Sequence, residues 1–127
     1  MLDERVTRHD RRVTLSISRD DGLVISDDRE RLDVDRIHGW LATSYWAPDR
    51  DRATVERSIA NSAPYAVYDA DGGQIAFTRV VTDWAAFAWI ADVIVDEAWR
   101  GRGVGSWLVG SVVEHLAAAG VPRQVLA

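Results

Sequence analysis

Three glycines interrupt the chain where a long apolar run gives way to a helical pattern. The run VIVDEAWRGRGVGSWLVGSVVEHLAAAG spans residues 93–120 and places glycines at positions 101, 103 and 105. The apolar residues up to Val95 predict a strand over residues 88–95 that is buried on both faces. Apolar residues then recur at helical spacing, at Val104, Trp107, Leu108, Val112 and Leu116. The segment therefore predicts a strand, a glycine-rich turn and a helix that ends near Gly120.

A junction of this kind is suited to binding an anion. The first backbone N–H groups of a helix have no partner within the helix, and the helix dipole adds positive potential there. Glycine lets a phosphate approach the backbone closely and tolerates positive φ. Arg100 and Arg102 add positive charge beside the turn. We therefore expect a ligand with a pyrophosphate; the alternative is a purely structural turn, in which each glycine would cost about 0.5–1 kcal/mol of local preference.

Two common phosphate-binding patterns do not fit this turn. The pattern G-x-x-x-x-G-K-[ST] requires a lysine, and the sequence contains none. The dinucleotide pattern G-x-G-x-x-G fails because Ser106 or Leu108 stands where its third glycine belongs. A nucleotide-binding protein is therefore supported only by the general argument for phosphate binding.

The remaining segments alternate between strand and helix patterns. Before the glycines we expect strands at residues 13–18 and 23–26, helices at 27–46 and 50–62, and strands at 65–69 and 74–81. A last strand is expected at residues 123–127. The order β-β-α-α-β-β-β-α-β indicates a mixed α/β fold rather than a doubly wound one.

The composition limits what this fold can do. With 127 residues, of which 47% are hydrophobic, the chain is expected to form one domain preceded by a charged arm at residues 1–12. No apolar stretch is long enough for a membrane span or a secretion signal, so we expect a cytoplasmic protein. There is no cysteine and the three histidines are scattered, so no metal site is expected. The net charge of -5 argues against a nucleic-acid partner.

The turn also fits a third pattern. Residues 100–105 spell R-G-R-G-V-G, which matches R-x-x-G-x-G between a strand and a helix. This resembles the acetyl-CoA signature [QR]-x-x-G-x-[GA] of the GNAT superfamily of N-acetyltransferases. Two helices and a three-strand antiparallel meander before the signature also match the family, so the resemblance covers roughly residues 22–127.

The resemblance implies a cofactor and a reaction. The cofactor would be acetyl-CoA, and the reaction would transfer its acetyl group to a primary amine of a small molecule or a protein. In the family, loop amides bind the pyrophosphate, which here corresponds to the backbone of Arg100, Gly101, Arg102, Gly103, Val104, Gly105 and Ser106. The preceding strand pairs with the pantetheine arm, which corresponds to Val93, Ile94 and Val95. A backbone N–H of Val93 or Ile94 would then stabilise the oxyanion.

Candidate residues for the acceptor side are fewer. Asp92 is the ionisable residue within the apolar run, and burial would raise its pKa, which suits a catalytic base or a group that positions water. The alternative is a structural pairing with an arginine such as Arg79. Tyr45, Trp46 and Trp84 are candidates to line the acceptor site through cation–π contacts, or else are core residues.

The family fold continues beyond the point where this sequence stops. After the signature helix the family has a strand that splays away to open the CoA slot, then a helix that often carries a tyrosine acid, and no residue here matches that tyrosine. The sequence leaves three explanations open: a fragment, a fold completed by a second chain in a swapped homodimer, or a degenerate copy. We expect a truncated acetyltransferase that associates with itself; the alternative is a catalytically impaired CoA-binding or interaction module.

Overall fold

One six-stranded sheet organises the protein. The computed structural model describes residues 15–127, so the arm expected at residues 1–12 lies outside the described residues. The strands follow chain order across the sheet: β1 (Ser16–Ser18), β2 (Val24–Ser26), β3 (Ala63–Tyr68), β4 (Gln74–Thr82), β5 (Ala88–Val95) and β6 (Gln124–Leu126). All neighbours are antiparallel except β5 and β6, which are parallel. The expected mixed α/β fold and its element order are confirmed.

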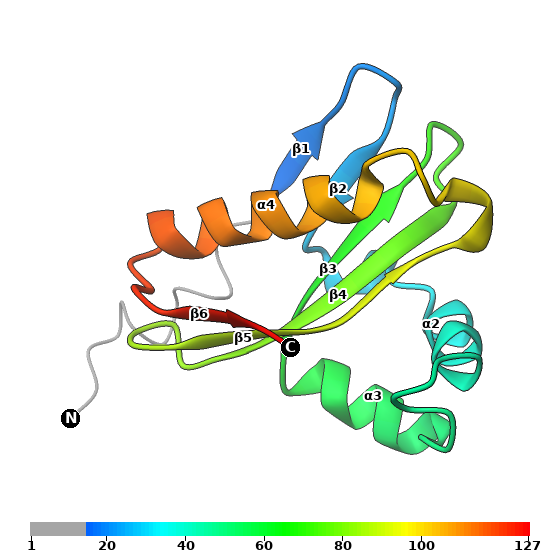
Figure 1. Ribbon diagram of the computed structural model, residues 1–127, viewed down its shortest axis with the longest axis horizontal. Coiled ribbons are helices and arrows are strands. Elements are labelled where there is room, and N and C mark those ends of the chain that lie inside the picture. Colours follow the sequence, from blue (N-terminus) through cyan, green and yellow to red (C-terminus); the bar gives the residue numbers. More distant parts are fainter. Residues whose placement is uncertain (1–14) are drawn as a thin grey trace.

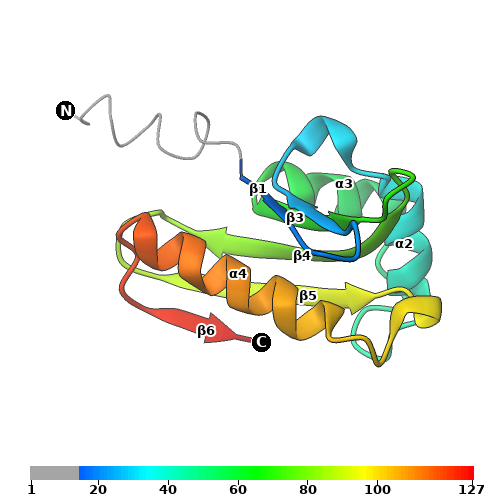
Figure 2. The same ribbon diagram turned by 90° about the horizontal axis from the view of Figure 1, so that it is seen from above.

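Three helices cover the two faces of this sheet. Helix α4 (Val104–Ala118) lies on one face, and α2 (Val34–Ala42) and α3 (Arg52–Ala60) lie on the other (Figures 1 and 2). Each face has its own core: Leu108 and Val112 of α4 pack into one cluster, and Ile37 of α2 packs with Phe77 and Ile94 in the other. Among residues 15–127, no helix has both the length and the hydrophobicity to span a membrane.

Helix α2 is shorter than the sequence pattern predicted. It begins after Asp33, whose carboxylate accepts a hydrogen bond from the Arg36 amide, and a separate 3-10 turn (Arg29–Arg31) precedes it. It ends at Ala42 rather than at residue 46, with Thr43 as its C-cap, and the hydroxyls of Thr43 and Ser44 donate to the carbonyls of Trp40 and Leu41. Side-chain hydroxyls that bond to the backbone in this way compete with helical hydrogen bonds. The aromatic pair at positions 45 and 46 therefore lies in the connection between α2 and α3.

Strand β5 is the element that links the two halves of the candidate site. Its first half pairs with β6 from Ala88↔Gln124 to Ile90↔Leu126, and the Ala127 amide donates to the Ile90 carbonyl. In the described part of the chain, no strand lies along this edge beside residues 91–95. On the β4 side the register shifts, so that Thr78 faces two residues of β5. This bulge precedes the turn that leads into α4.

Candidate active site

The turn before α4 is built on two left-handed glycines. Gly101 has φ +79° and Gly103, the N-cap of α4, has φ +74°, a region that residues with a Cβ rarely occupy. No side chain caps the N-terminus of α4. The first intrahelical bond runs from the Trp107 amide to the Gly103 carbonyl, so the amides before it are not used within the helix. These unpaired donors and the helix dipole favour an anion at this end.

The space in front of these amides could hold such an anion. A pocket of about 310 Å³ is lined by residues of the turn and of the first turn of α4, among them Arg100, Gly101, Gly103 and Ser106. A Cβ added at Gly101 or Gly103 would meet nothing within 4 Å, so glycine is required there for its backbone conformation. At Gly105 a Cβ would lie 3.4 Å from Val95 Cγ2, so there a small residue lets α4 approach β5. An elongated diphosphate fits this donor set.

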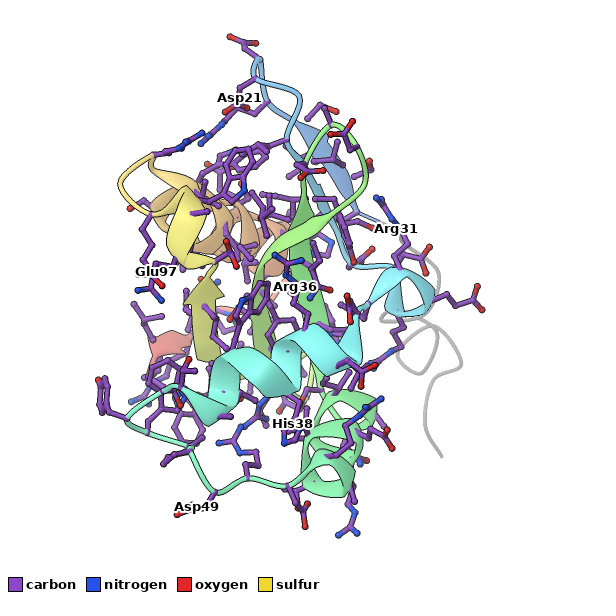
Figure 3. The ribbon with its side chains drawn as sticks, turned by 90° about the vertical axis from the view of Figure 1, so that its right-hand side faces the viewer. Asp21, Arg31, Arg36, His38, Asp49 and Glu97 are labelled. Carbon is purple, nitrogen blue, oxygen red and sulfur yellow. The ribbon has the colours of Figure 1, made fainter. Side chains whose placement is uncertain are left out.

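Three arginines surround the turn. Arg100 Nε donates to the Val95 carbonyl at 3.2 Å, and the guanidinium of Arg102 lies 4.8 Å from the Trp99 ring centroid. Arg19 pairs with Asp21, which lies in the β1–β2 turn (Figure 3). The Nη2 of Arg19 lies 3.4 Å from the Arg102 carbonyl oxygen. Sequence reasoning did not identify Arg19, because it lies 83 positions away in the chain and only the fold brings it here. Since Asp21 offsets the charge of Arg19, the positive charge beside the turn comes mainly from Arg100 and Arg102.

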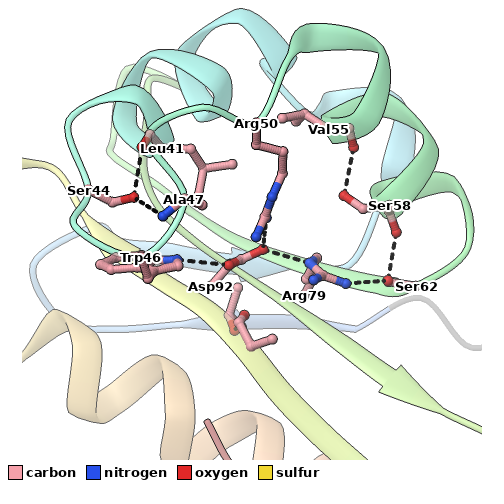
Figure 4. A network of polar contacts seen from close by, with 12 residues as sticks. Leu41, Ser44, Trp46, Ala47, Arg50, Val55, Ser58, Ser62, Arg79 and Asp92 are labelled. Atoms are coloured by element: carbon pink, nitrogen blue, oxygen red, sulfur yellow. Dashed lines mark hydrogen bonds and ion pairs between the residues drawn. The ribbon is translucent and has the colours of Figure 1, made fainter.

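Asp92 stands at the centre of a hydrogen-bond network in the bulge of β5. Its Oδ2 accepts bonds from Arg79 Nε at 2.6 Å and Arg50 Nη1 at 2.8 Å, and its Oδ1 accepts one from the Trp46 indole at 3.0 Å (Figure 4). Arg79 also donates to the Ser62 hydroxyl at 3.2 Å. The side chain of Asp92 is 5% exposed, and its backbone is left-handed with φ +53°. A residue held in this conformation persists only where its surroundings fix it.

The network reverses the pKa shift that the sequence predicted for Asp92. Burial alone would raise the pKa of the carboxyl, but hydrogen bonds from Arg79, Trp46 and Arg50 outweigh burial and lower the pKa below its ordinary value. The expectation of a raised pKa is therefore wrong, and the pairing with Arg79, which the sequence left as the alternative, is present in the structure. At neutral pH the residue is an ionised carboxylate.

The predicted aromatic residues are divided between two places. Tyr45 and Trp46 line a pocket of about 400 Å³ together with Asp92 and Val93. Trp84 lines a different pocket, of about 210 Å³, beside Asp27 and Tyr65, and the structure does not bring it to the other two. Sequence reasoning also missed Trp89 and Arg50, which line the pocket of Tyr45 and Trp46. Arg50 follows Pro48 closely, but nothing local in the sequence indicates that it reaches β5.

A third pocket connects the turn with the Asp92 pocket. It has a volume of about 270 Å³ and shares Arg100 with the pocket at the turn and Tyr45 and Trp46 with the pocket at Asp92. Ile94 of β5 lines it as well. The three pockets thus follow the half of β5, residues 91–95, that has no neighbouring strand on this edge. This arrangement suits a long ligand with an anionic end. Among residues 15–127 no group of three or more His, Asp or Glu side chains is arranged to hold a metal ion.

Comparison with known proteins places this geometry in a family. The family model described as "Acetyltransferase (GNAT) family" matches residues 28–127. No curated protein matches the chain. A solved structure from Xanthomonas campestris pv. campestris, assigned to the GNAT acetyltransferases, is 38% identical, with a TM-score of 0.76 over 83% of this chain and 74% of its own.

Two more distant structures share the fold. The ribosomal-protein-S18-alanine N-acetyltransferase from Escherichia coli is 18% identical, with a TM-score of 0.67 over 82% of this chain and 65% of its own. An aminoglycoside 6'-N-acetyltransferase complexed with coenzyme A is 17% identical, with a TM-score of 0.61 over 75% of this chain and 56% of its own. The family match and the 38% identical structure show that the chain belongs to the GNAT acetyltransferases, enzymes that transfer the acetyl group of acetyl-CoA.

Proposed function

We propose that this protein is an N-acetyltransferase that moves the acetyl group of acetyl-CoA to a primary amine of a small molecule or a protein. The observation that carries the proposal is the continuity between the left-handed turn at Gly101 and Gly103 and the strand-free half of β5. The N-terminus of α4, which favours an anion, follows directly on the edge of β5 whose backbone groups have no neighbouring strand. This arrangement suits a cofactor with a diphosphate and an amide-containing arm. Structural neighbours act on both acceptor classes, an aminoglycoside and a ribosomal protein.

The residues of the turn would hold the diphosphate. The residues from Arg100 to Ser106, all of which except Arg102 line the pocket at the N-terminus of α4, would offer their free amides to it; the Arg100 amide itself donates to the Glu97 carbonyl. The side chains of Arg100 and Arg102 would add positive charge beside the diphosphate. Val93, Ile94 and Val95 would offer backbone groups to the pantetheine arm along the free edge of β5. When bound, acetyl-CoA supplies a thioester, which is the activated acyl group.

The chemical step needs a neutral amine, an oxyanion stabiliser and a proton for the departing thiolate: as the new N–C bond forms and the C–S bond breaks, the proton that the amine loses balances the one that the thiolate takes up. A backbone N–H of Val93 or Ile94 would donate a hydrogen bond to the acetyl oxygen as negative charge develops on it. Asp92 is ionised and engaged by three donors, so we assign it a positioning role: it fixes Trp46, Arg50 and Arg79 around the acceptor pocket. Tyr45 and Trp46 would line the acceptor pocket, and Trp84, which lies elsewhere, takes no part in this proposal.

Release of free CoA tests the proposal directly. The 127-residue chain has no cysteine, so a thiol reagent added to it reports CoA alone. The purified protein is incubated with acetyl-CoA and a panel of amines that includes amino acids, polyamines and peptides with free N-termini. We expect CoA release that requires both an amine and the protein. Acetyl-CoA binding without amine-dependent release for any amine in the panel would contradict the proposal.

A further inference from the structure

The charged groups that line the pocket around Asp92 restrict the kind of ligand that it can bind. Its lining includes three charged side chains: the guanidinium groups of Arg50 and Arg79 and the carboxylate of Asp92. Asp92 offsets one of the two guanidinium charges, and the cationic groups of the lining are those of Arg50 and Arg79. Because Asp92 already accepts bonds from both arginines and from Trp46, it offers little to an ammonium group.

The two arginines retain unused hydrogen-bond donors. Arg50 bonds to Asp92 through Nη1, and Arg79 uses Nε for Asp92 and Nη1 for Ser62. Over residues 15–127 this leaves Nε and Nη2 of Arg50 and Nη2 of Arg79 without a hydrogen-bond partner, although the two side chains are only 22% and 18% exposed. Planar guanidinium donors of this kind match the oxygens of a carboxylate or a phosphate.

The rest of the pocket is aromatic. Tyr45, Trp46 and Trp89 line it, with 92%, 44% and 46% of their surfaces exposed. Tyr45 and Trp46 pack edge to face, with ring centroids 5.3 Å apart. Aromatic residues exposed at a pocket leave apolar area for a ligand to bury. Val93, the strand residue assigned above to the acetyl site, lines the same pocket.

We propose that the amine acceptor carries an anionic group, a carboxylate or a phosphate, together with an apolar or aromatic body. The anionic group binds Arg50 and Arg79, and the body contacts the rings of Tyr45, Trp46 and Trp89. This inference rests on the proposed function, and it adds the chemical class of the acceptor.

Matched pairs of amines test the role of the anionic group. Wild-type protein with acetyl-CoA is given L-phenylalanine against phenethylamine, and O-phosphoethanolamine against ethanolamine; the two pairs separate a carboxylate from a phosphate. We expect kcat/KM for an anionic member to exceed that of its partner by about 10- to 100-fold, the factor associated with a hydrogen bond to a charged group. An equal or greater rate for the uncharged partners would overturn the proposal.

Substitutions then locate the effect at the arginines. Arg50→Gln should bring the ratio within each pair close to 1, and Arg50→Lys should restore part of it, because Asp92 keeps Arg79 in both variants. Arg52→Gln is the matched control: Arg52 pairs with Asp35 and Glu56 on the surface of α3, outside the pocket. An unchanged ratio in Arg50→Gln, or an equal loss in the control, would contradict the assignment.

A binding measurement separates this inference from the proposed function. The indole N–H of Trp46 is one of six tryptophan indole signals and can be assigned by Trp46→Phe. In CoA-saturated protein, L-phenylalanine or O-phosphoethanolamine should shift this signal more than the uncharged partners do. A selective shift without acetylation would support the anion site while the transferase proposal fails. No shift with either anionic probe would overturn the inference, whatever amines are acetylated.

Discussion

Asp92 and Arg79 join β5 to β4 at the bulge, with Oδ2 and Nε 2.6 Å apart. The pair faces the side of the sheet that α2 and α3 cover, and Arg50 and Trp46 complete it from the loop between those helices (Figure 4). A single buried carboxylate thus connects the strand that carries the proposed acetyl site to the segment that carries the proposed acceptor site. The stability and the activity of this region should therefore depend on the same residue.

Asp92→Asn should lower the free energy of unfolding by about 1.5–3 kcal/mol, since it removes the charge that strengthens three hydrogen bonds. Asparagine tolerates the left-handed backbone of this position, so the change reports on charge rather than on strain. Chemical denaturation measures the effect. Asp49→Asn, a change at an exposed loop position, is the matched control and should be nearly neutral. If both variants lose the same stability, the network does not stabilise the fold.

The stabilisation by Asp92 should depend on pH in a definite direction. Its pKa is lower in the folded protein than in the unfolded chain, so its contribution is fully present above the unfolded value of about 3.9. The contribution is lost as the pH falls through the folded pKa. The difference in unfolding free energy between wild type and Asp92→Asn should be constant from about pH 5 upward and shrink in more acidic solution. A difference that grows on acidification would contradict the lowered pKa.

Arg100 should contribute to cofactor affinity. It lines both the pocket at the turn and the connecting pocket, and its Nε holds the Val95 carbonyl. Arg100→Gln should weaken acetyl-CoA binding about tenfold, as expected for the loss of a charge-assisted contact, and should reduce the sensitivity of binding to salt. Calorimetric titration at two ionic strengths measures both effects. Arg57→Gln, at an exposed position of α3, should change neither.

The fold was largely predictable because its patterns are local. The hairpin β3–β4, the apolar β5 and the amphipathic α4 each follow from periodicity and turn residues within one short segment. The end of α2 was not predictable in this way, because Tyr45 continues the helical spacing although the helix ends at Ala42. The hydroxyls of Thr43 and Ser44 bond to the last carbonyls of the helix, and such side-chain bonds compete with the periodic signal.

The site was predictable where one segment builds it. The turn at Gly101 and Gly103 could be identified from the sequence, since glycines before a helix imply left-handed backbone. Asp92 could be found as the charged residue of an apolar strand, but its pKa direction could not. That direction depends on hydrogen bonds from Arg79, Trp46 and Arg50 together, and the last two lie 46 and 42 positions earlier in the chain, where only the fold brings them to Asp92.

The most direct test of the account is a calorimetric titration of acetyl-CoA into Gly103→Val. Gly103 has φ +74° with open space around it, so valine would displace the backbone amides rather than clash with a neighbour. Gly110→Ala, within α4 and also in open space, is the folded control and should bind like the wild type. We expect at least about a tenfold loss of affinity in Gly103→Val, equal to about 1.4 kcal/mol. Unchanged affinity in a folded Gly103→Val protein would contradict the claim that these amides hold the diphosphate.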